Sequence, residues 1–291
     1  MVVVTADAGG TKTTVAVTDN GRRLIEILGP GAAIRPGRAL VTATIVADLM
    51  RSALAQVNLH RADAIVIGAA GAGRVADAED LRQAMAWERL ADRVVVVSDV
   101  ELAFEALGSA VGLVLVAGTG SVAMGRTAAG QPVRQGGYGW QMGDEGGGYW
   151  IGRQALMAVG IAHDGRGPAT ALTQGLLAAT GTAGFRDLVG WSTLASPREV
   201  ASLSQAVVAA AGQGDSGAEG ILNRAATQLA LLVNTLAPEF SGGSGIPVGL
   251  VGGLIGQSGP LRGQVEPLIR PPFAPIGSAV DPLLGGPRLA R

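Results

Sequence analysis

Two short glycine turns carry residue types that bind phosphate. The first contains Gly9, Gly10, Thr11, Lys12 and Thr13, and the second contains Gly118, Thr119 and Gly120. Glycine leaves backbone N–H groups open to an anion because it has no Cβ, and the hydroxyls and the Lys12 ammonium add further donors. Strands are expected on both sides of each turn, so neither is a Walker A loop, which precedes a helix. Either turn alone could be a plain hairpin, but together they indicate a polyphosphate site.

Two aspartates stand beside predicted strands. Asp7 directly precedes the first turn and could hold Mg²⁺ through water ligands. Asp99 follows the β-branched run Val94–Val97, where it could accept a proton from a substrate hydroxyl in a phosphoryl transfer. Asp99 could equally stabilise the first turn of a helix through the helix dipole. The residues alone leave both interpretations open.

A third segment, residues 136–153, combines dense glycine with acids and aromatic rings. Asp144 is a candidate to accept hydrogen bonds from sugar hydroxyls, while Tyr149 and Trp150 are better explained as core residues. A fourth segment, Gly249–Leu254, contains Gly252 and Gly253, where a flat adenine ring could lie against backbone. This fourth signal is weak without the others.

The hydrophobic pattern places these segments on an alternation of strands and helices. Strands are expected around both glycine turns, at Arg23–Leu28, at Ala64–Gly68, at Val94–Val97 and at Val248–Val251. Helices are expected at Arg38–Val57 and at Asp77–Arg89, from Ser98 to about Gly108, through most of Tyr149–Leu236, at Leu261–Ile269 and at Pro275–Leu284. The two strand–turn–strand starts predict two related α/β domains facing an interdomain cleft, each with a mixed sheet.

Composition excludes several classes of function. The 291 residues include no cysteine, which argues against disulfides, thiolate metal sites and cysteine nucleophiles. A net charge of -1 gives no basic field for nucleic acid, and no apolar run approaches the roughly 20 residues of a membrane span. We therefore expect a cytoplasmic protein that acts on a small molecule. Lys12 is the single lysine among 22 basic residues, which draws attention to the first turn.

The chain resembles the N-acetylglucosamine kinase branch of the actin-like ATPase superfamily, which is related to the BadF/BadG/BcrA/BcrD ATPases. The similar segments, in order, are DAGGTKTT, VVSDVELAF, VAGTGSVAMG, GGYGWQMGDEGGGYWIGRQAL, DGRGP and VGLVGGL. The resemblance runs from Val2 to about Ala279. It implies actin-like (ribonuclease H-like) domains over residues 1–110 and 111–274, the second with a helical insertion, and a closing helix in residues 275–291 that packs on the first domain. A homodimer is plausible by the same resemblance.

The resemblance also implies an ATP- and Mg²⁺-dependent kinase that phosphorylates the 6-hydroxyl of an amino sugar, with N-acetylglucosamine the first choice. Asp99 would be the general base, and Asp7 would help to hold the metal. Both glycine turns, with Gly252 and Gly253, would bind nucleotide. The sugar would be bound by Gly71, Asp99, Thr119, Gly137, Tyr138 and Asp144.

Three departures from the family pattern leave other sugars open. Ala32 and Ala33 follow Gly29-Pro30-Gly31, where an asparagine is usual; Tyr138 replaces a frequent tryptophan; and Gly147 replaces a serine. The alternatives are glucosamine, glucose or another hexose, or a non-sugar ATPase of the same superfamily. Activators of radical dehydratases and the zinc-bearing glucokinase branch both use cysteine ligands, which this chain lacks. A chaperone-like ATPase would need inserted domains, and the spacing from Gly68 to Gly73 does not fit a dinucleotide fingerprint.

Overall fold

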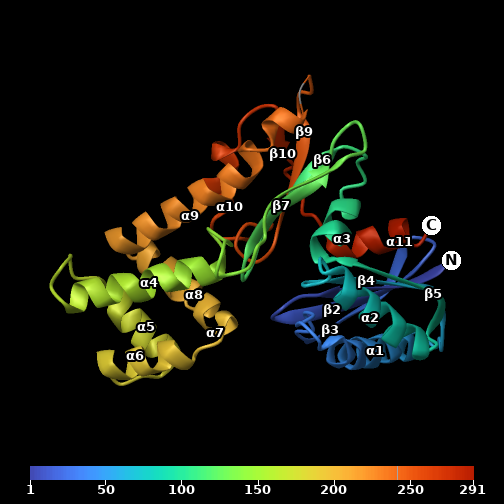
Figure 1. Ribbon diagram of the computed structural model, residues 1–291, viewed down its shortest axis with the longest axis horizontal. Coiled ribbons are helices and arrows are strands. Elements are labelled where there is room, and N and C mark those ends of the chain that lie inside the picture. Colours follow the sequence, from blue (N-terminus) through green and yellow to red (C-terminus); the bar gives the residue numbers. More distant parts are fainter. Residues whose placement is uncertain (241) are drawn as a thin grey trace. The chain divides into compact units, whose positions relative to one another are not determined.

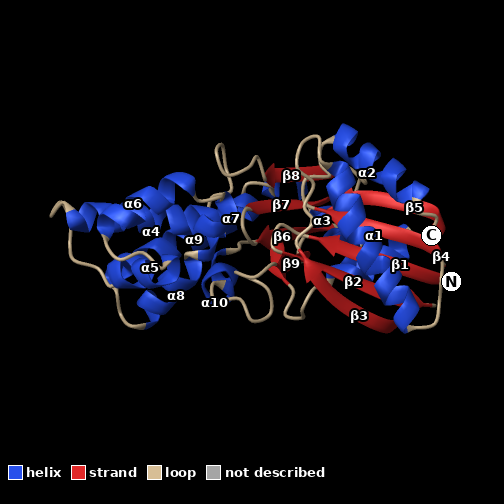
Figure 2. Cartoon of the chain, turned by 90° about the horizontal axis from the view of Figure 1, so that it is seen from below, coloured by secondary structure: helices blue, strands red, loops and turns tan. Residues whose placement is uncertain are grey.

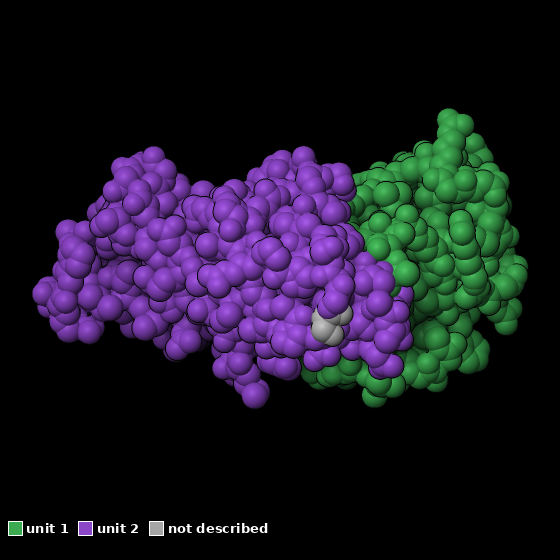
Figure 3. Space-filling model, turned by 90° about the horizontal axis from the view of Figure 1, so that it is seen from above, with its two compact units in different colours: residues 1–110, 280–291 green, residues 111–279 purple. Residues whose placement is uncertain are grey.

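The computed structural model describes residues 1–240 and 242–291. These residues form two compact units, shown in two colours in Figure 3. Unit 1 is Met1–Ala110 together with Val280–Arg291, and unit 2 is Val111–Ala279. Residues 275–279, which the sequence analysis grouped with the closing segment, lie in unit 2.

Unit 1 is built on a five-stranded mixed sheet in the order β3-β2-β1-β4-β5. Its strands are β1 (Val2–Ala8), β2 (Lys12–Asp19), β3 (Arg22–Pro30), β4 (Ala62–Ala69) and β5 (Ala91–Ser98). The first three strands pair antiparallel through tight turns, whereas β4 and β5 run parallel to β1. Parallel neighbours need a crossover connection, and helices provide it here.

Helices cover both faces of this sheet, as Figure 1 shows. On one face α1 (Ala39–Gln56) and α2 (Val75–Trp87) pack against alternate β1 residues such as Val4 and Ala6. On the other face α3 (Asp99–Ala106) and α11 (Gly286–Leu289) cover Val3 and Val66. This alternation follows from the two-residue period of a strand, and it orients Asp7 to the face of α3.

Unit 2 has a second five-stranded mixed sheet in the order β10-β9-β6-β7-β8. Its strands are β6 (Gly112–Ala117), β7 (Ser121–Arg126), β8 (Pro132–Gly136), β9 (Ile246–Val251) and β10 (Phe273–Pro275). Its described residues also form the helices α4 (Gly148–His163), α5 (Leu172–Thr180), α6 (Phe185–Leu194), α7 (Pro197–Ser202), α8 (Ser204–Gly212), α9 (Ser216–Asn234) and α10 (Arg262–Val265). Short 3-10 turns occur at Ala237–Phe240, Glu266–Leu268 and Pro282–Gly285 in the chain. Figure 2 separates helices from strands by colour.

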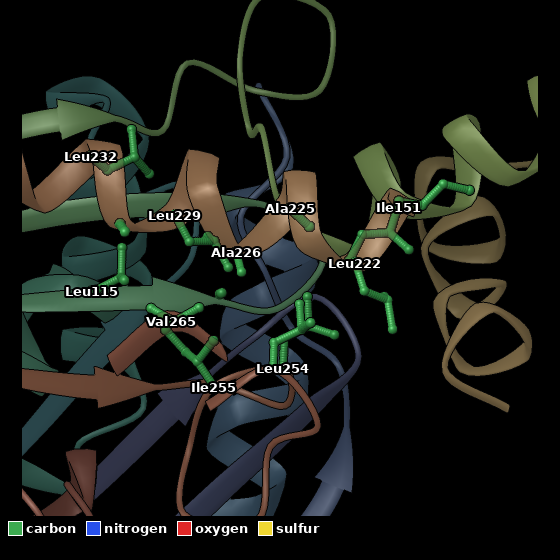
Figure 4. Packing of buried hydrophobic residues seen from close by; sticks show 14 of the residues in the cluster. Leu115, Ile151, Leu222, Ala225, Ala226, Leu229, Leu232, Leu254, Ile255 and Val265 are labelled. Carbon is green, nitrogen blue, oxygen red and sulfur yellow. The ribbon is translucent and has the colours of Figure 1, made fainter. Parts of the chain in front are cut away.

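The core of unit 2 forms around α9. Buried side chains on one face of this helix, including Leu222 and Leu229, lie in one cluster with Leu115 of β6 and with Leu254 and Val265. Figure 4 shows these side chains pointing toward one another. The heptad-like spacing of the buried residues is that of an amphipathic helix on a sheet.

The mixed α/β class, with one mixed sheet in each half of the chain, is confirmed. Two expected helices are corrected. Pro275 ends β10 rather than starting a helix, so the closing helical turns begin at Pro282. The helix expected over Leu261–Ile269 ends at Val265, because Pro267 has no N–H and a 3-10 turn follows. The edge strands β8 and β10 were not anticipated, since each is short and contains proline. Within the described residues, no helix has both the length and the apolar character needed to cross a bilayer.

Replacing Leu229 with alanine should destabilise unit 2 by about 2–5 kcal/mol, because its fully buried side chain would leave a cavity against the sheet. Leu231→Ala is the matched control, since Leu231 is on the same helix but 49% exposed, and it should cost less than about 0.5 kcal/mol. Urea unfolding followed by tryptophan fluorescence measures both. Equal midpoints for the two variants would contradict the described packing.

Candidate active site

Three parallel strands of unit 1 end together at one edge of the sheet. In the strand registers, Ala8 of β1 lies beside Ala69 of β4, and Ala69 lies beside Ser98 of β5. The residues that follow these strands are the first glycine turn, Ala70 with Gly71, and Asp99. Ligands of open α/β sheets bind outside the carboxyl ends of the strands. The predicted nucleotide, metal and base residues of unit 1 therefore share the edge where chemistry is expected.

The first turn is fixed on one side and open on the other. The Gly9 N–H donates to the Lys12 carbonyl oxygen at 3.0 Å, which closes the hairpin. The Gly9 carbonyl oxygen accepts from the N–H groups of Ala32 and Ala33 at 3.1 and 3.2 Å. Gly10, Thr11 and Lys12 are exposed, and a Cβ at Gly10 would meet no atom within 4 Å. The free space beside Gly10 is what an anion bound by backbone N–H groups requires. The Thr13 hydroxyl, in contrast, is buried and has no hydrogen-bond partner among the described residues.

Asp7 lies in a negatively charged environment. Burial first, and then the negative charges of Asp99 and Asp281, raise the pKa of Asp7 to about 7, while the positive charge of Lys12 opposes the rise. These influences show that Asp7, Asp99 and Lys12 are electrostatic neighbours within unit 1. Burial and neighbouring carboxylates can raise the pKa of a carboxyl group to near neutral pH. A cation that binds beside such a group stabilises its ionised form.

Asp99 is the first residue of α3. The Ser98 hydroxyl caps this helix by accepting from the Glu101 N–H at 3.1 Å, as the capping-box spacing predicts. Asp99 is half-buried. Its position at the carboxyl end of β5, close enough to Asp7 to influence the pKa of that residue, puts a carboxylate at the same sheet edge as the first glycine turn.

Gly71 is needed for the backbone geometry at the end of β4. It has a positive φ of 94°, and a Cβ there would overlap the Ile34 carbonyl oxygen. The Ile34 N–H donates to the Ala70 carbonyl oxygen at 2.8 Å, and the Arg74 guanidinium donates to the Ile34 carbonyl oxygen at 2.9 Å. The segment after β3 is thus pinned to both β1 and β4 at the carboxyl edge.

In unit 2 the second turn lies beside Gly252. Strands β6 and β9 are parallel and end at Ala117 and Val251, and the Leu254 N–H donates to the Ala117 carbonyl oxygen at 3.2 Å. Gly252 has a φ of 102°, and a Cβ there would overlap the Ala117 oxygen. Cβ atoms at Gly118 and Gly253 would meet nothing within 4 Å. Two unobstructed stretches of backbone therefore adjoin one another.

The start of α4 locks onto this second turn. The N–H groups of Gly148 and Tyr149 donate to the carbonyl oxygens of Gly118 and Thr119 at 2.8 and 2.9 Å. A Cβ at Gly147 would come within 2.7 Å of the Gly120 carbonyl carbon. Glycine at position 147 allows this close approach, and a serine there would require the turn to shift. The close approach of Gly147 to Gly120 therefore gives a steric reason for glycine at this position, where the family pattern has serine.

Asp144 lies over the same turn. A Cβ at Gly120 would come within 2.6 Å of the Asp144 carboxyl carbon, and Asp144 adopts a left-handed backbone with a φ of 63°. Burial raises the pKa of Asp144, while backbone N–H groups of Ser121 and Gly139 counteract the rise. The structure therefore brings Asp144 next to Gly120 of the second glycine turn.

The segment that contains Gly137 and Tyr138 follows β8. Arg134 donates to the carbonyl oxygens of Gly136 and Gly137 at 3.2 and 2.8 Å, and both glycines have positive φ. The Tyr138 side chain is 66% exposed and available to a ligand. The neighbouring Trp140 is 42% exposed, and its ring lies 5.1 Å from that of Tyr149.

Sequence reasoning missed one charged residue of the unit 1 site. Asp281 is the second residue of the C-terminal segment that belongs to unit 1, where it raises the pKa of Asp7 and pairs with Arg23. No local pattern marks Asp281, because its position depends on how the C-terminal segment returns to unit 1. Within each unit the predicted residues do come together: Asp7, the first turn, Gly71 and Asp99 in unit 1, and the second turn, Gly137, Tyr138, Asp144, Gly252 and Gly253 in unit 2.

Known proteins resemble the chain along most of its length. An N-acetylmuramic acid/N-acetylglucosamine kinase of Clostridium acetobutylicum is 30% identical over 245 residues, which cover 82% of this chain and 80% of that protein. An N-acetyl-D-glucosamine kinase of Dictyostelium discoideum is 29% identical and covers 99% of this chain and 97% of its own. A crystal structure solved as that of a candidate N-acetylglucosamine kinase from Chromobacterium violaceum has a TM-score of 0.82 at 23% identity, over 100% of this chain and 99% of that one.

The family model that matches describes the BadF/BadG/BcrA/BcrD ATPases and aligns with residues 6–282. This span includes both glycine turns, Asp99, Asp144 and the Gly252-Gly253 pair. The two-domain fold of the structural relative agrees with the two mixed sheets. The predicted relationship is thus confirmed, and the chain belongs to the BadF/BadG/BcrA/BcrD ATPase family.

Proposed function

We propose that this protein is an ATP-dependent sugar kinase that transfers the γ-phosphoryl group of ATP to the 6-hydroxyl of an amino sugar, with N-acetylglucosamine as the first candidate. The observation that carries the proposal is the proximity of Asp7, Asp99 and the first glycine turn at one sheet edge of a member of an ATPase family. The two curated relatives are kinases of N-acetylated amino sugars, which supports this substrate class.

In this proposal, the two glycine turns bind phosphates of the same nucleotide. The open space at Gly10 and at Gly118 leaves backbone N–H groups free for this role. Lys12 neutralises negative charge, and Gly252 with Gly253 border the adenosine. Catalysis of phosphoryl transfer requires mainly that the reacting groups are positioned and that the phosphate charge is neutralised. Glycine turns with one lysine can do both.

Asp99 acts as the general base. It accepts the proton of the sugar 6-hydroxyl while the bond from that oxygen to the γ-phosphorus forms and the bond from the γ-phosphorus to the β,γ-bridging oxygen breaks. ADP leaves with the electrons of that bond. Asp144 accepts hydrogen bonds from sugar hydroxyls, and Gly137 and Tyr138 lie beside the 2-substituent of the sugar.

The charge around Asp7 fits a divalent cation. The raised pKa of Asp7 reflects burial and neighbouring carboxylates. A bound cation would offset the repulsion between these negative charges. Among the described residues, no group of three or more acids or histidines could hold a metal without help, so the nucleotide would supply the remaining oxygen ligands. When bound, Mg²⁺ would neutralise charge on the β- and γ-phosphates. Asp7 and, through its field, Asp99 are the residues of this chain that would favour it.

A panel of sugars tests the proposal directly. ADP release with MgATP should be stimulated strongly by N-acetylglucosamine, and less by glucosamine and glucose. The position of the new phosphate is read by NMR of the product. ADP release that no sugar accelerates would refute the kinase proposal and favour a non-sugar ATPase.

Asp99→Asn should lower kcat by at least about 10²-fold, because the base is lost while the shape of the site is kept. Nucleotide affinity, measured with a fluorescent ATP analogue, should remain within about twofold of wild type. Asp80→Asn, an exposed aspartate on α2, is the matched control and should leave kcat unchanged. Near-wild-type turnover of Asp99→Asn would remove Asp99 as the base.

Asp144→Asn should raise the KM for the sugar by about 10- to 100-fold, since hydrogen bonds to a charged acceptor contribute about 1.5–3 kcal/mol. The KM for ATP should change much less. Steady-state kinetics with each substrate varied in turn separates the two effects. An unchanged sugar KM, or an equal rise in the KM for ATP, would contradict a sugar-binding role.

The pKa of Asp7 near 7 predicts a pH dependence of metal binding. Below pH 7 the carboxyl group is protonated and must lose its proton before it favours a cation, so apparent Mg²⁺–nucleotide affinity should rise as pH increases toward 7, by up to about tenfold per unit. Because the pKa of Asp7 is higher in the folded protein than its ordinary value of 3.8, the unliganded protein should also lose stability as pH rises from about 4 to 7. Calorimetric titration of MgADP from pH 5.5 to 8.5 measures the first effect. In Asp7→Asn the part of the pH dependence due to this carboxyl should vanish, leaving only that of the nucleotide, and identical profiles in both proteins would refute the assignment.

A further inference from the structure

The loop between β3 and α1, residues 31–38, lies at the carboxyl edge of the unit 1 sheet. Its backbone is anchored at three points: the N–H groups of Ala32 and Ala33 donate to the Gly9 oxygen, and the Ile34 N–H donates to the Ala70 oxygen. Gly9 belongs to the first turn, and Ala70 precedes Gly71. This loop, termed the β3–α1 loop, is therefore built into the same edge as Asp7 and Asp99.

The first half of the β3–α1 loop offers no polar side chain. Ala32 and Ile34 are buried in the core, and Ala33 is apolar. The next polar side chains are those of Arg35 and Arg38, and both are exposed. Throughout residues 1–240 and 242–291, neither guanidinium has an ion pair or a side-chain hydrogen bond. Any polar recognition by this loop's side chains must come from these two cations.

The two arginines do not stabilise the fold around them. Arg38 occupies the N-cap of α1 without a capping bond, and the first turn of α1 contains no acidic residue. A cation at this end of a helix is unfavourable by about 0.3–1 kcal/mol. The carboxylate that contacts the backbone of this loop, Asp77, is already paired with Arg74 and accepts from the Gly37 N–H at 3.2 Å. Residues that oppose local stability are expected at functional sites.

We propose that Arg35 and Arg38 bind a carboxylate on the acceptor, so that the preferred substrates are amino sugars that carry an acidic substituent. This inference rests on the proposed kinase function and names its substrate class. A guanidinium fits a carboxylate through two parallel N–H bonds, and two guanidiniums on one anchored loop can share one anion. N-acetylmuramic acid, which differs from N-acetylglucosamine by a lactyl ether on the 3-oxygen, presents such a carboxylate.

Three phosphoryl acceptors distinguish the effect of the acceptor's charge from the effect of its shape. They are N-acetylglucosamine, N-acetylmuramic acid, and the methyl ester of N-acetylmuramic acid, which keeps the bulk and loses the charge. For wild type, kcat/KM for the acid should exceed that for its ester by about tenfold, and the difference should shrink as salt is raised. The double variant Arg35→Gln/Arg38→Gln should lose this difference while kcat/KM for N-acetylglucosamine and the KM for ATP stay within about twofold.

Arg22→Gln is the matched control. Arg22 is an exposed arginine at the start of β3, beside Asp19 and thus at the opposite edge of the sheet, and its loss should leave the acid-to-ester ratio unchanged. If wild type phosphorylates N-acetylglucosamine but treats the acid and the ester alike, the inference is wrong and the kinase proposal stands. If the double variant instead raises the KM for ATP with every sugar, the arginines bind nucleotide phosphate and the inference is also wrong. If no sugar is phosphorylated by wild type, the kinase proposal itself has failed.

Discussion

Parallel pairing of β1, β4 and β5 is the constraint on which the chemistry of unit 1 depends. The registers place Ala8, Ala69 and Ser98 side by side, so that residues distant in the chain follow neighbouring strand ends. A shift of one residue would move Asp7 to the opposite face, into the apolar core where Ala6 and Ala8 now pack. Because helices cover both faces of the sheet, such a shift would place the carboxylate among apolar side chains with no polar partner, which is unfavourable. The hydrophobic pattern of the strand therefore determines the position of the aspartate as well.

Glycine has two different purposes in the candidate site, and both occur in each unit. At Gly10, Gly118 and Gly253 the absence of a Cβ leaves open space, which suits contact with a ligand. At Gly31, Gly71, Gly147 and Gly252 it allows segments of backbone to touch, which holds the turns in place. The close-packed glycines contact the two glycine turns: Gly147 lies against Gly120, and Gly31 lies against Gly10. A glycine-rich sequence can thus give a well-defined site, because close backbone packing replaces side-chain packing.

Much of this arrangement was predictable from the sequence. The strands around both turns, the capped start of α3 and the helix α1 follow from local pattern and capping chemistry. The short edge strands β8 and β10 have too few residues and too much proline to give a pattern. The influence of Asp281 on Asp7 and the contact of Asp144 with Gly120 arise from tertiary packing alone. The steric reason for Gly147 likewise requires coordinates. Residue types therefore predicted which side chains matter, while their mutual positions came from packing.

The return of the C-terminal segment to unit 1 has a consequence for biosynthesis. Gly286 packs directly on Thr5 of β1, Ala290 is buried against the same sheet, and Arg93 donates to the Ala290 carbonyl oxygen at 2.8 Å. Unit 1 therefore needs residues from both ends of the chain, whereas unit 2 is continuous from Val111 to Ala279. Domains usually complete folding in the order in which the ribosome delivers them. Here the order is reversed: the second unit has its full sequence first, and one face of the unit 1 sheet is covered only in part, by α3, until Val280–Arg291 have been translated.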